Sequence, residues 1–291
     1  MKISIVTPSF NQGKFLEQTI QSVLGQDYES IEYIIIDGGS TDDSVGVIRR
    51  YEKDLAYWIS EKDRGQAHAI NKGLEKATGD IFAFINSDDL YLPGAFRAVA
   101  EYFRENPSCE WLCGETILFG PDRQTVLAPT RVPKTAAHAL SWAYSAAQPG
   151  MFWKREIIKD GVQERWRYCF DNELYARLLI RGHKCEYLPL PVAAYRYHAT
   201  SKTVAEGELF DDEFDQITEM YLKELKGGQR RWAVGTLLLR RSFQASQTGN
   251  AKASAKFLLR SLMVYPAGII SRPFWGCFRR ALKSGFVLLN N

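Results

Sequence analysis

The stretch Gly79-Asp80-Ile81-Phe82-Ala83-Phe84-Ile85-Asn86-Ser87-Asp88-Asp89 decides the fold. Its five central apolar residues predict a buried strand, because a short run rich in aromatic and branched side chains favours a strand over a helix. The run ends in two adjacent carboxylates, and Pro93 then opens a helical pattern. Polar residues at the carboxyl end of a central strand lie where open α/β sheets bind ligands. Asp88 and Asp89 therefore predict either a divalent-cation site or a cap of the next helix.

Strands and helices alternate around this stretch. Further strands are predicted over 2–8, 31–36 and 55–60, and apolar residues at helical spacing predict helices between them. One helix is expected to start at a capping box formed by Ser40 and Asp43. This alternation implies βαβ crossovers and a mostly parallel sheet. Irregular strands follow over 110–131, with a turn at Pro121-Asp122, and three helices are predicted at 206–226, 230–247 and 251–264.

Composition limits the classes of protein that fit. The 291 residues are 45% hydrophobic and 24% charged, as in ordinary globular proteins. Five widely spaced cysteines form neither a disulfide framework nor a metal pattern, so we expect reduced thiols. The N-terminus enters a strand directly, and no apolar segment has the length of a membrane span, so we expect a cytoplasmic protein.

The net charge of +3 is unevenly distributed. No Asp or Glu follows Glu224, whereas twelve Lys and Arg lie between Lys226 and Lys283. The chain before Lys226 therefore carries 25 basic and 34 acidic residues, a net charge of −9. A basic C-terminal part indicates an anionic partner.

Polar clusters follow four of the predicted strands: Thr7-Pro8-Ser9, Asp37-Gly38-Gly39, Glu61 to Gln66 and Asn86 to Asp89. Each cluster alone could form a turn, since Asp, Asn, Ser and Gly are turn formers. Together they fall at one edge of one sheet. The glycines match neither the dinucleotide-binding fingerprint nor the P-loop, so the sequence argues against those two nucleotide sites.

These clusters, with Asp63-Arg64-Gly65-Gln66, Ala69-Ile70-Asn71-Lys72-Gly73 and Ala77-Thr78-Gly79-Asp80, resemble the successive motifs of family 2 glycosyltransferases. The resemblance covers residues 1 to about 200 and implies the GT-A fold, a nucleotide-sugar donor and inversion at the anomeric carbon. It implies a nucleotide-binding set at the strand ends: Thr7, Pro8, Ser9, Asp37, Asp63, Arg64, Lys72, Asn86 and Ser87. For Lys72, contact with a phosphate and a place on the solvated surface stay equally open.

The same resemblance implies a metal site. The family motif is usually Asp-x-Asp, and Asn86 stands at its first position here. Asp88 is then the ligand for Mn²⁺ or Mg²⁺, and Asp89 supports it or caps the next helix. His198, in Arg196-Tyr197-His198-Ala199-Thr200-Ser201, would complete the metal site or contact the diphosphate.

The acceptor side is expected in the second half of the resemblance. Gln148 and Trp153 lie in a segment similar to the family's acceptor-side strand, and Trp142, Trp153 and Trp166 offer faces for sugar rings or form core. Asp171 resembles the family's general base at the head of a helix, where backbone donors keep a carboxylate ionised. The alternatives are an N-cap role and Glu173 as the base.

The sequence thus predicts a GT-A catalytic domain over 1–204, with a nucleotide-sugar half at 1–108 and an acceptor half at 109–204. A basic helical extension follows over 205–291. The expected activity is transfer of a sugar, by default from a UDP-sugar, to a glycan or lipid-linked glycan in surface polysaccharide or glycolipid synthesis. A sugar-1-phosphate nucleotidyltransferase and a non-catalytic glycan-binding scaffold remain as alternatives, and no nucleic-acid partner is expected.

The segment from Pro266 mixes aromatic, leucine and basic residues. This composition fits a helix lying on the inner face of an anionic membrane, which would bring the enzyme to a lipid-linked acceptor. A helix packed on the catalytic core, with a solvated basic face, explains the same pattern equally well.

Overall fold

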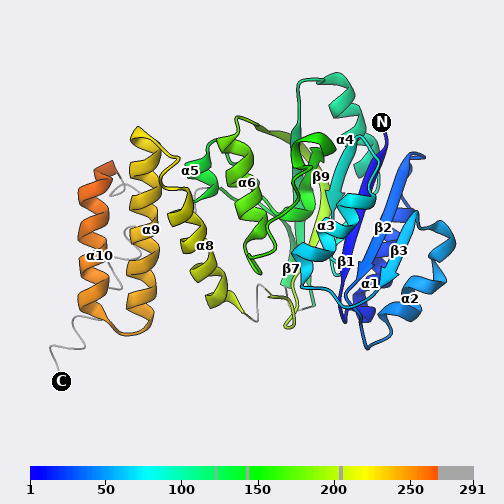
Figure 1. Cartoon of the computed structure of the whole chain (residues 1–291), viewed down its shortest axis with the longest axis horizontal. Helices are drawn as coiled ribbons and strands as arrows, with labels where there is room; N and C mark the ends of the chain where they lie inside the picture. The colour runs from blue at the N-terminus through cyan, green and yellow to red at the C-terminus, as the bar shows by residue number, and fades with distance from the viewer. Residues whose placement is uncertain (122, 142–143, 203–205, 268–291) are drawn as a thin grey trace. The chain divides into compact units, whose positions relative to one another are not determined.

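The computed structural model describes residues 1–121, 123–141, 144–202 and 206–267 (Figure 1). The chain forms two compact units. The first contains residues 1–134 and 144–207, and the second contains 135–143 and the chain from 208 onward. Residues 268–291, which hold most of the basic aromatic segment expected to contact a membrane, lie outside the described residues, as does Trp142.

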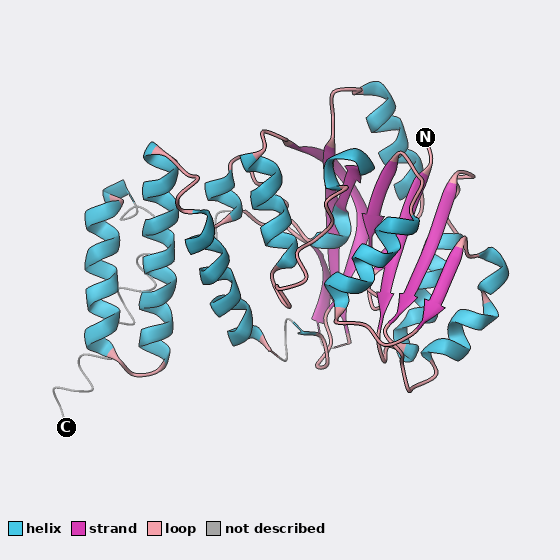
Figure 2. Ribbon diagram, viewed as in Figure 1, coloured by secondary structure: helices cyan, strands magenta, loops and turns pink. Residues whose placement is uncertain are grey.

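The first unit is built on one sheet, whose strands are drawn in magenta in Figure 2. The described strands run in the order β3-β2-β1-β4-β8-β6-β9-β5, with β7 paired to β6. Strands β3, β2, β1 and β4 are parallel, β8 is antiparallel to its neighbours, and β6 is parallel to β9. The α/β prediction is therefore confirmed. The strands are β1 (Ile3–Ser9), β2 (Ile31–Asp37), β3 (Tyr57–Ser60), β4 (Ile81–Phe84), β5 (Leu90–Tyr91), β6 (Trp111–Gly120), β7 (Arg123–Leu127), β8 (Met151–Lys154) and β9 (Cys185–Arg196).

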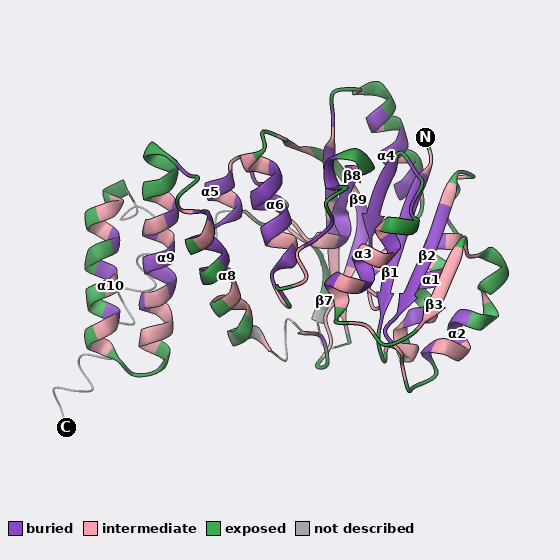
Figure 3. Cartoon of the chain, viewed as in Figure 1, coloured by how far each residue is buried: buried purple, intermediate pink, exposed green. Residues whose placement is uncertain are grey.

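Helices cover both faces of this sheet. They are α1 (Gly13–Leu24), α2 (Ser44–Arg50), α3 (Gln66–Lys76), α4 (Ala95–Glu105) and α6 (Phe170–Ile180), with 3-10 helices η1 (Glu52–Asp54), η2 (Gln148–Gly150) and η3 (Arg155–Ile158). Helix α4 shows the general rule: Phe96, Val99 and Phe103 recur at helical spacing and are all buried. Figure 3 shows buried and exposed segments alternating along this helix. Each such side chain contributes roughly 1.5–3 kcal/mol by leaving water.

The second unit consists of α5 (Ala136–Ala139), α8 (Gly207–Tyr221), α9 (Gly227–Gln247) and α10 (Ala251–Val264). Arg240 of α9 is fully buried, and its Nε donates to Asp215 Oδ1 at 2.7 Å while a terminal nitrogen donates to Thr218 Oγ1 at 2.8 Å. Because its charge is paired and hydrogen-bonded, the guanidinium can remain inside. None of the helices in the described ranges is both long and apolar enough to cross a bilayer.

The predicted capping box before α2 is wrong. Helix α2 begins at Ser44 after Asp43, whose side chain accepts no capping hydrogen bond. Ser40 instead donates to Asp37 Oδ1 at 2.6 Å, and Ser44 donates to Asp42. Asp and Ser side chains that bond to nearby backbone build a turn here rather than a helix start.

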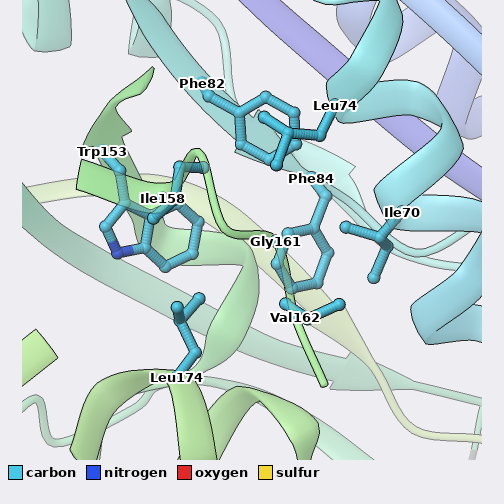
Figure 4. Close-up of a pocket in the computed structure, with 9 residues that line it drawn as sticks. All are labelled: Ile70, Leu74, Phe82, Phe84, Trp153, Ile158, Gly161, Val162 and Leu174. Carbon is cyan, nitrogen blue, oxygen red and sulfur yellow. The ribbon is translucent and has the colours of Figure 1, made fainter. Parts of the chain in front are cut away.

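A wholly apolar pocket lies inside the first unit, between α3 and the sheet (Figure 4). Its lining comes from α3, β4, β8, η3, the segment after η3, and α6: Ile70, Leu74, Phe82, Phe84, Trp153, Ile158, Gly161, Val162 and Leu174. A donor site needs several polar groups to orient its ligand, and among the side chains of this lining only the Trp153 indole carries one. The pocket is therefore a packing space of the core.

Glu32 of β2 provides a test of the fold. Burial of its carboxylate opposes ionisation, but hydrogen bonds from Lys2, Ser4 and Thr78 outweigh burial and lower the pKa to about 2. The folded pKa is below the unfolded value, so this stabilisation is present above pH 4.5 and is lost as pH falls towards 2. We expect Glu32→Gln to lower the free energy of unfolding by about 2 kcal/mol at neutral pH. In urea titrations across this window, a difference that stays constant as pH falls would contradict the account.

Candidate functional site

The polar clusters meet at one edge of the sheet because the strands before them are parallel and in register. Ser9 at the end of β1 is paired with Asp37 at the end of β2, and Asp37 with Ser60 of β3. The Ile85 N–H donates to Val6 O at 2.9 Å, which brings the segment after β4 to the same edge.

Asp88 and His198 face each other, although 110 residues separate them. Asp88 Oδ2 lies 2.9 Å from His198 Nε2, and the side chains are 16% and 7% exposed. The other ring nitrogen, Nδ1, lies 2.8 Å from Thr200 Oγ1. The ring of Phe15 packs against the imidazole, with centroids 4.5 Å apart. The Thr200 hydroxyl at Nδ1 and the Phe15 ring on one face of the imidazole thus fix the direction in which Nε2 points.

Arg196 and Asp89 hold this pair together. The Arg196 N–H donates to Asp89 Oδ1 at 2.8 Å, and its Nε donates to Asp88 O at 2.7 Å. The guanidinium lies over Phe15 and Phe119, 5.0 and 4.6 Å from the ring centroids. The expectation that Asp89 caps a helix is wrong, because β5 follows it and α4 begins at Ala95. Burial and the neighbouring Asp88 charge raise the pKa of Asp89 well above its usual range.

Asn86 takes a supporting position beside this pair. Its Oδ1 accepts from Gln66 Nε2 at 2.6 Å, and its Nδ2 donates to Asp89 Oδ2 at 3.3 Å. Gln66 in turn accepts from Lys202 Nζ at 2.9 Å. Ser87 is buried next to Asn86. The start of α3, the segment after β4 and the segment after β9 are therefore joined by side chains.

The four residues expected to hold the nucleoside from β1 and β2 are buried in this structure. Thr7 Oγ1 lies 3.0 Å from the Tyr33 hydroxyl. Both Asp37 oxygens are used within the protein: Oδ1 accepts from Ser40 Oγ, and Oδ2 from the Gly39 and Ser40 N–H groups and Ser60 Oγ. The Asp37 carboxylate thus shapes the turn after β2. Pro8 lies buried between Thr7 and Ser9, and Ser9 Oγ has no partner among the described residues.

Three further nucleotide candidates already have partners. Asp63 accepts from the Gly65 N–H at 2.7 Å and lies so close to Gly38 that a Cβ there would be 2.7 Å from its Oδ2. Arg64 donates to Glu164 Oε2 from Nε at 2.9 Å and from a terminal nitrogen at 2.7 Å. Lys72 is paired with Glu61.

Asp171 lies in the first turn of α6, one residue beyond its start. The N-cap is Cys169, so the N-cap alternative for Asp171 is wrong. Burial raises the pKa of Asp171 to about 6, against hydrogen bonds from Asn172 that lower it. Oδ1 accepts the bonds from Asn172 at 2.8 and 3.0 Å. A hydrogen bond from the N–H of Asp171 itself also lowers the pKa. Because the pKa is nevertheless about 6, the carboxyl can accept a proton near neutral pH.

Glu173, the competing carboxylate, is fully buried and paired with Arg177, whose Nε lies 2.9 Å from Oε1. Arg177 also donates to Gly161 O at 2.7 Å. The residue after Gly161, Val162, exchanges two 2.9 Å hydrogen bonds with the Asn71 side chain of α3. Arg177, which Glu173 holds in place, therefore connects α6 to this segment, and Asn71 connects the segment to α3.

The structure corrects the acceptor-side prediction for Trp153. This side chain is 0% exposed, and its ring is stacked between those of Phe84 and Tyr175, so it belongs to the core. Trp166 is also buried, with the guanidinium of Arg165 over its ring. Gln148 donates from Nε2 to Phe84 O at 2.8 Å, and its buried Oε1 has no partner among the described residues.

The side chains of Asp88 and His198 suit a divalent ion that is bound by these two residues and by a ligand such as a nucleotide. In the described residues no group of three or more His, Cys, Asp or Glu could hold a metal by itself. A carboxylate and an imidazole nevertheless converge here, and both are ligands that Mn²⁺ accepts. Divalent ions that bind nucleotides commonly take one or two protein ligands and complete their shell with phosphate oxygens and water.

Comparison with known proteins places the chain in a family. The model of "Glycosyl transferase family 2" matches residues 4–153, about half of the chain. The chain belongs to this family. Asp88 and the strand ends before it all lie inside the matched range, whereas Asp171 and His198 follow it.

Two relatives illustrate how far the similarity extends. An uncharacterised glycosyltransferase of Nostoc sp. is 28% identical over 275 residues, which cover 85% of this chain and 84% of that protein. The GalNAc(5)-diNAcBac-PP-undecaprenol beta-1,3-glucosyltransferase of Campylobacter jejuni is 32% identical over 108 residues, 36% of this chain and 35% of its own. The second match is thus confined to about a third of each protein.

Solved structures share the fold. TarS 1-349 of S. aureus, in complex with UDP-GlcNAc, has a TM-score of 0.69 at 16% identity over 98% of this chain and 89% of that chain. The mannosyltransferase PcManGT of Pyrobaculum calidifontis, with GDP-Man and Mn²⁺, has a TM-score of 0.60 at 18% identity, covering 98% and 86%. The predicted GT-A fold is confirmed by these likenesses.

Asp89 offers a test of how the site is held. We expect Asp89→Ala to lower the free energy of unfolding by about 1–3 kcal/mol, because the Arg196 N–H and the Asn86 amide lose their buried acceptor. Asp89→Asn keeps an acceptor oxygen and should cost less. Chemical denaturation at neutral pH measures both, and equal costs for the two variants would contradict this role.

Proposed function

We propose that this glycosyltransferase moves a sugar from a nucleotide-sugar donor to a hydroxyl of a glycan or lipid-linked glycan, with inversion at the anomeric carbon. One observation carries the proposal: Asp88 and His198 converge at the edge where β1, β2 and β4 end. Support for the donor comes from the two solved structures of the same fold, whose ligands are UDP-GlcNAc and GDP-Man with Mn²⁺. A UDP-sugar is our default donor.

Asp88 and His198 would hold a Mn²⁺ or Mg²⁺ ion together with the donor diphosphate. Such an ion neutralises charge on the departing nucleoside diphosphate. The wall of the nucleoside site would be formed by Thr7, Pro8, Ser9, Asp37 and Asp63. Asp37 would contribute through the turn after β2, which its carboxylate shapes. Arg64 and Lys72 would leave their carboxylate partners to approach the ligand. Asn86 and Ser87 would lie on the ribose side.

Asp171 would act as the general base. Its Oδ2 would take the proton of the acceptor hydroxyl as that oxygen attacks the anomeric carbon on the face opposite the leaving group. Burial of the carboxyl favours this role, because a pKa of about 6 leaves it ionised at neutral pH yet basic enough to accept a proton. Gln148 remains a candidate for acceptor contact through its unpartnered Oε1.

The biological setting that we propose is glycolipid or surface polysaccharide synthesis, at the inner face of a membrane. The support is the Campylobacter jejuni relative, whose name specifies an undecaprenol-linked acceptor. The catalytic domain would span residues 1–204, with the helical part from 205 onward as an accessory unit.

A donor screen tests the metal and donor assignments together. We expect one nucleotide sugar to raise the unfolding temperature more with Mn²⁺ than without it, because a ligand that binds only the folded state stabilises it. Asp88→Asn should remove the metal-dependent part of the shift. Asp27→Asn, at an exposed carboxylate paired with Arg97, is the matched control and should behave as the parent. Equal shifts with and without metal would overturn the metal site.

Asp171→Asn tests the base. We expect transfer to fall by about 10²–10⁴-fold, the usual contribution of a general base. In the parent, kcat/KM should rise with pH through an apparent pKa of about 6 and level off above it, because only the ionised carboxylate accepts a proton.

Glu173→Gln is the control for that experiment. It should lower thermal stability by breaking the buried pair with Arg177 while leaving the shape of the pH profile unchanged. If Asp171→Asn transferred normally and Glu173→Gln were inactive at a temperature where it is folded, the base would be Glu173.

A further inference from the structure

The hairpin of α9 and α10 is a cationic element without acidic residues. From Lys226 to Ala267 the chain has eight Lys and Arg and no Asp or Glu. Arg240 and Arg241 pair with Asp215 and Glu219 of α8. The remaining six make no ion pair within the part of the chain that the structure describes: Lys226, Arg230, Arg231, Lys252, Lys256 and Arg260.

Helix α10 presents two different faces. Ser254, Leu258 and Ser261 are buried, and Ser254 and Ser261 bond to Ser242 and Gly235 of α9. At about 100° per residue, the opposite face carries three cations and two large apolar side chains. The face consists of Lys252, Lys256, Leu259, Arg260 and Met263, all exposed.

The apolar members of this face are conspicuous for their exposure. Leu259 is 62% exposed and Met263 is 81% exposed. The end of α10 that carries Met263 lies beside the start of α9, where Trp232 and Tyr265 stack with ring centroids 6.4 Å apart. Arg230 and Arg231 immediately precede Trp232. Cations, partly exposed aromatic rings and apolar side chains therefore gather at one end of the hairpin.

We propose that this cationic and apolar surface of the α9–α10 hairpin docks on the anionic headgroups of a lipid bilayer. Lysine and arginine near an anionic leaflet attract its headgroups, and apolar side chains between them enter the acyl boundary. Tryptophan and tyrosine favour the depth of the headgroups. A soluble polyanion would account for the cations, but it offers no place for Leu259 and Met263.

The contact is peripheral, in keeping with the absence of a spanning helix from the described ranges. The purpose of this contact, which is to bring the site to a lipid-linked acceptor, rests on the proposed function. The evidence for the contact comes from the hairpin alone. Residues 1–207 contribute nothing to the argument, so the docking surface and the catalytic assignments can fail separately.

Co-sedimentation of the full chain with vesicles tests the proposal without donor, metal or acceptor. The vesicles are phosphatidylcholine alone or phosphatidylcholine mixed with phosphatidylglycerol. We expect binding only to the mixture, and the triple variant Lys252→Gln, Lys256→Gln, Arg260→Gln should weaken it on the order of 100-fold. The double variant Leu259→Ser, Met263→Ser should also weaken binding, and the loss should persist at raised salt.

A matched triple variant controls for net charge. Arg49→Gln, Lys53→Gln and Arg104→Gln remove the same three charges from exposed positions in the first unit and should leave binding unchanged. The proposal is overturned if the control variant loses as much vesicle binding as the Lys252, Lys256 and Arg260 variant. It is also overturned if that hairpin variant binds vesicles as tightly as the parent. Unchanged binding by the Leu259 and Met263 variant would also overturn it, in favour of a general polyanion site. Transfer to a soluble acceptor, measured in parallel, reports separately on the proposed function.

Discussion

A buried hydrogen bond from the Arg196 N–H to the Asp89 carboxyl holds the candidate site together. It joins the segment after β4 to the end of β9, two parts of the chain that are more than a hundred residues apart. Asp88 directly precedes Asp89, and His198 follows Arg196 by two residues, so the bond keeps these two candidate ligands close together. Burial favours the neutral form of Asp89, so a polar contact can be kept there without a second negative charge beside Asp88.

The charges of the site are already paired before any ligand binds. Arg64 pairs with Glu164 and Lys72 pairs with Glu61, and in each pair one side chain is well exposed, Arg64 at 68% and Glu61 at 53%. Exposed pairs of this kind contribute only about 0–1 kcal/mol. Exchanging such a partner for a phosphate or a ribose hydroxyl therefore costs little. The pairs instead keep long side chains near the sheet edge, where a ligand would meet them.

The sequence predicted the elements best where the period of apolar residues was unambiguous. The sequence places helix α10 at its observed bounds, and the parallel half of the sheet follows from the alternation of strands and helices alone. The prediction that Trp153 contacts the acceptor is wrong because the sequence does not tell whether an aromatic strand is covered on both faces. The structure shows that the Trp153 side chain is fully buried. The partnership of Arg64 with Glu164 left no trace in the sequence, since the two are a hundred residues apart. The supporting role of Arg196 could have been predicted from the sequence, because Arg196 lies two residues before His198 in the motif that runs from Arg196 to Ser201.

The asparagine contact between α3 and Val162 has a consequence for protein engineering. Helix α6, which carries Asp171, is tied through Arg177 to Gly161, and the next residue is tied through Asn71 to α3. Gly161 has a positive φ of 68°, and a Cβ there would be 2.4 Å from Asn71 Oδ1, so the junction tolerates no other residue easily. Helices α3 and α6 are thus connected through residues 161 and 162. A chimera that exchanges donor preference with a relative must therefore transplant α3, residues 161–164 and α6 together. A crossover between these parts would separate hydrogen-bonded partners.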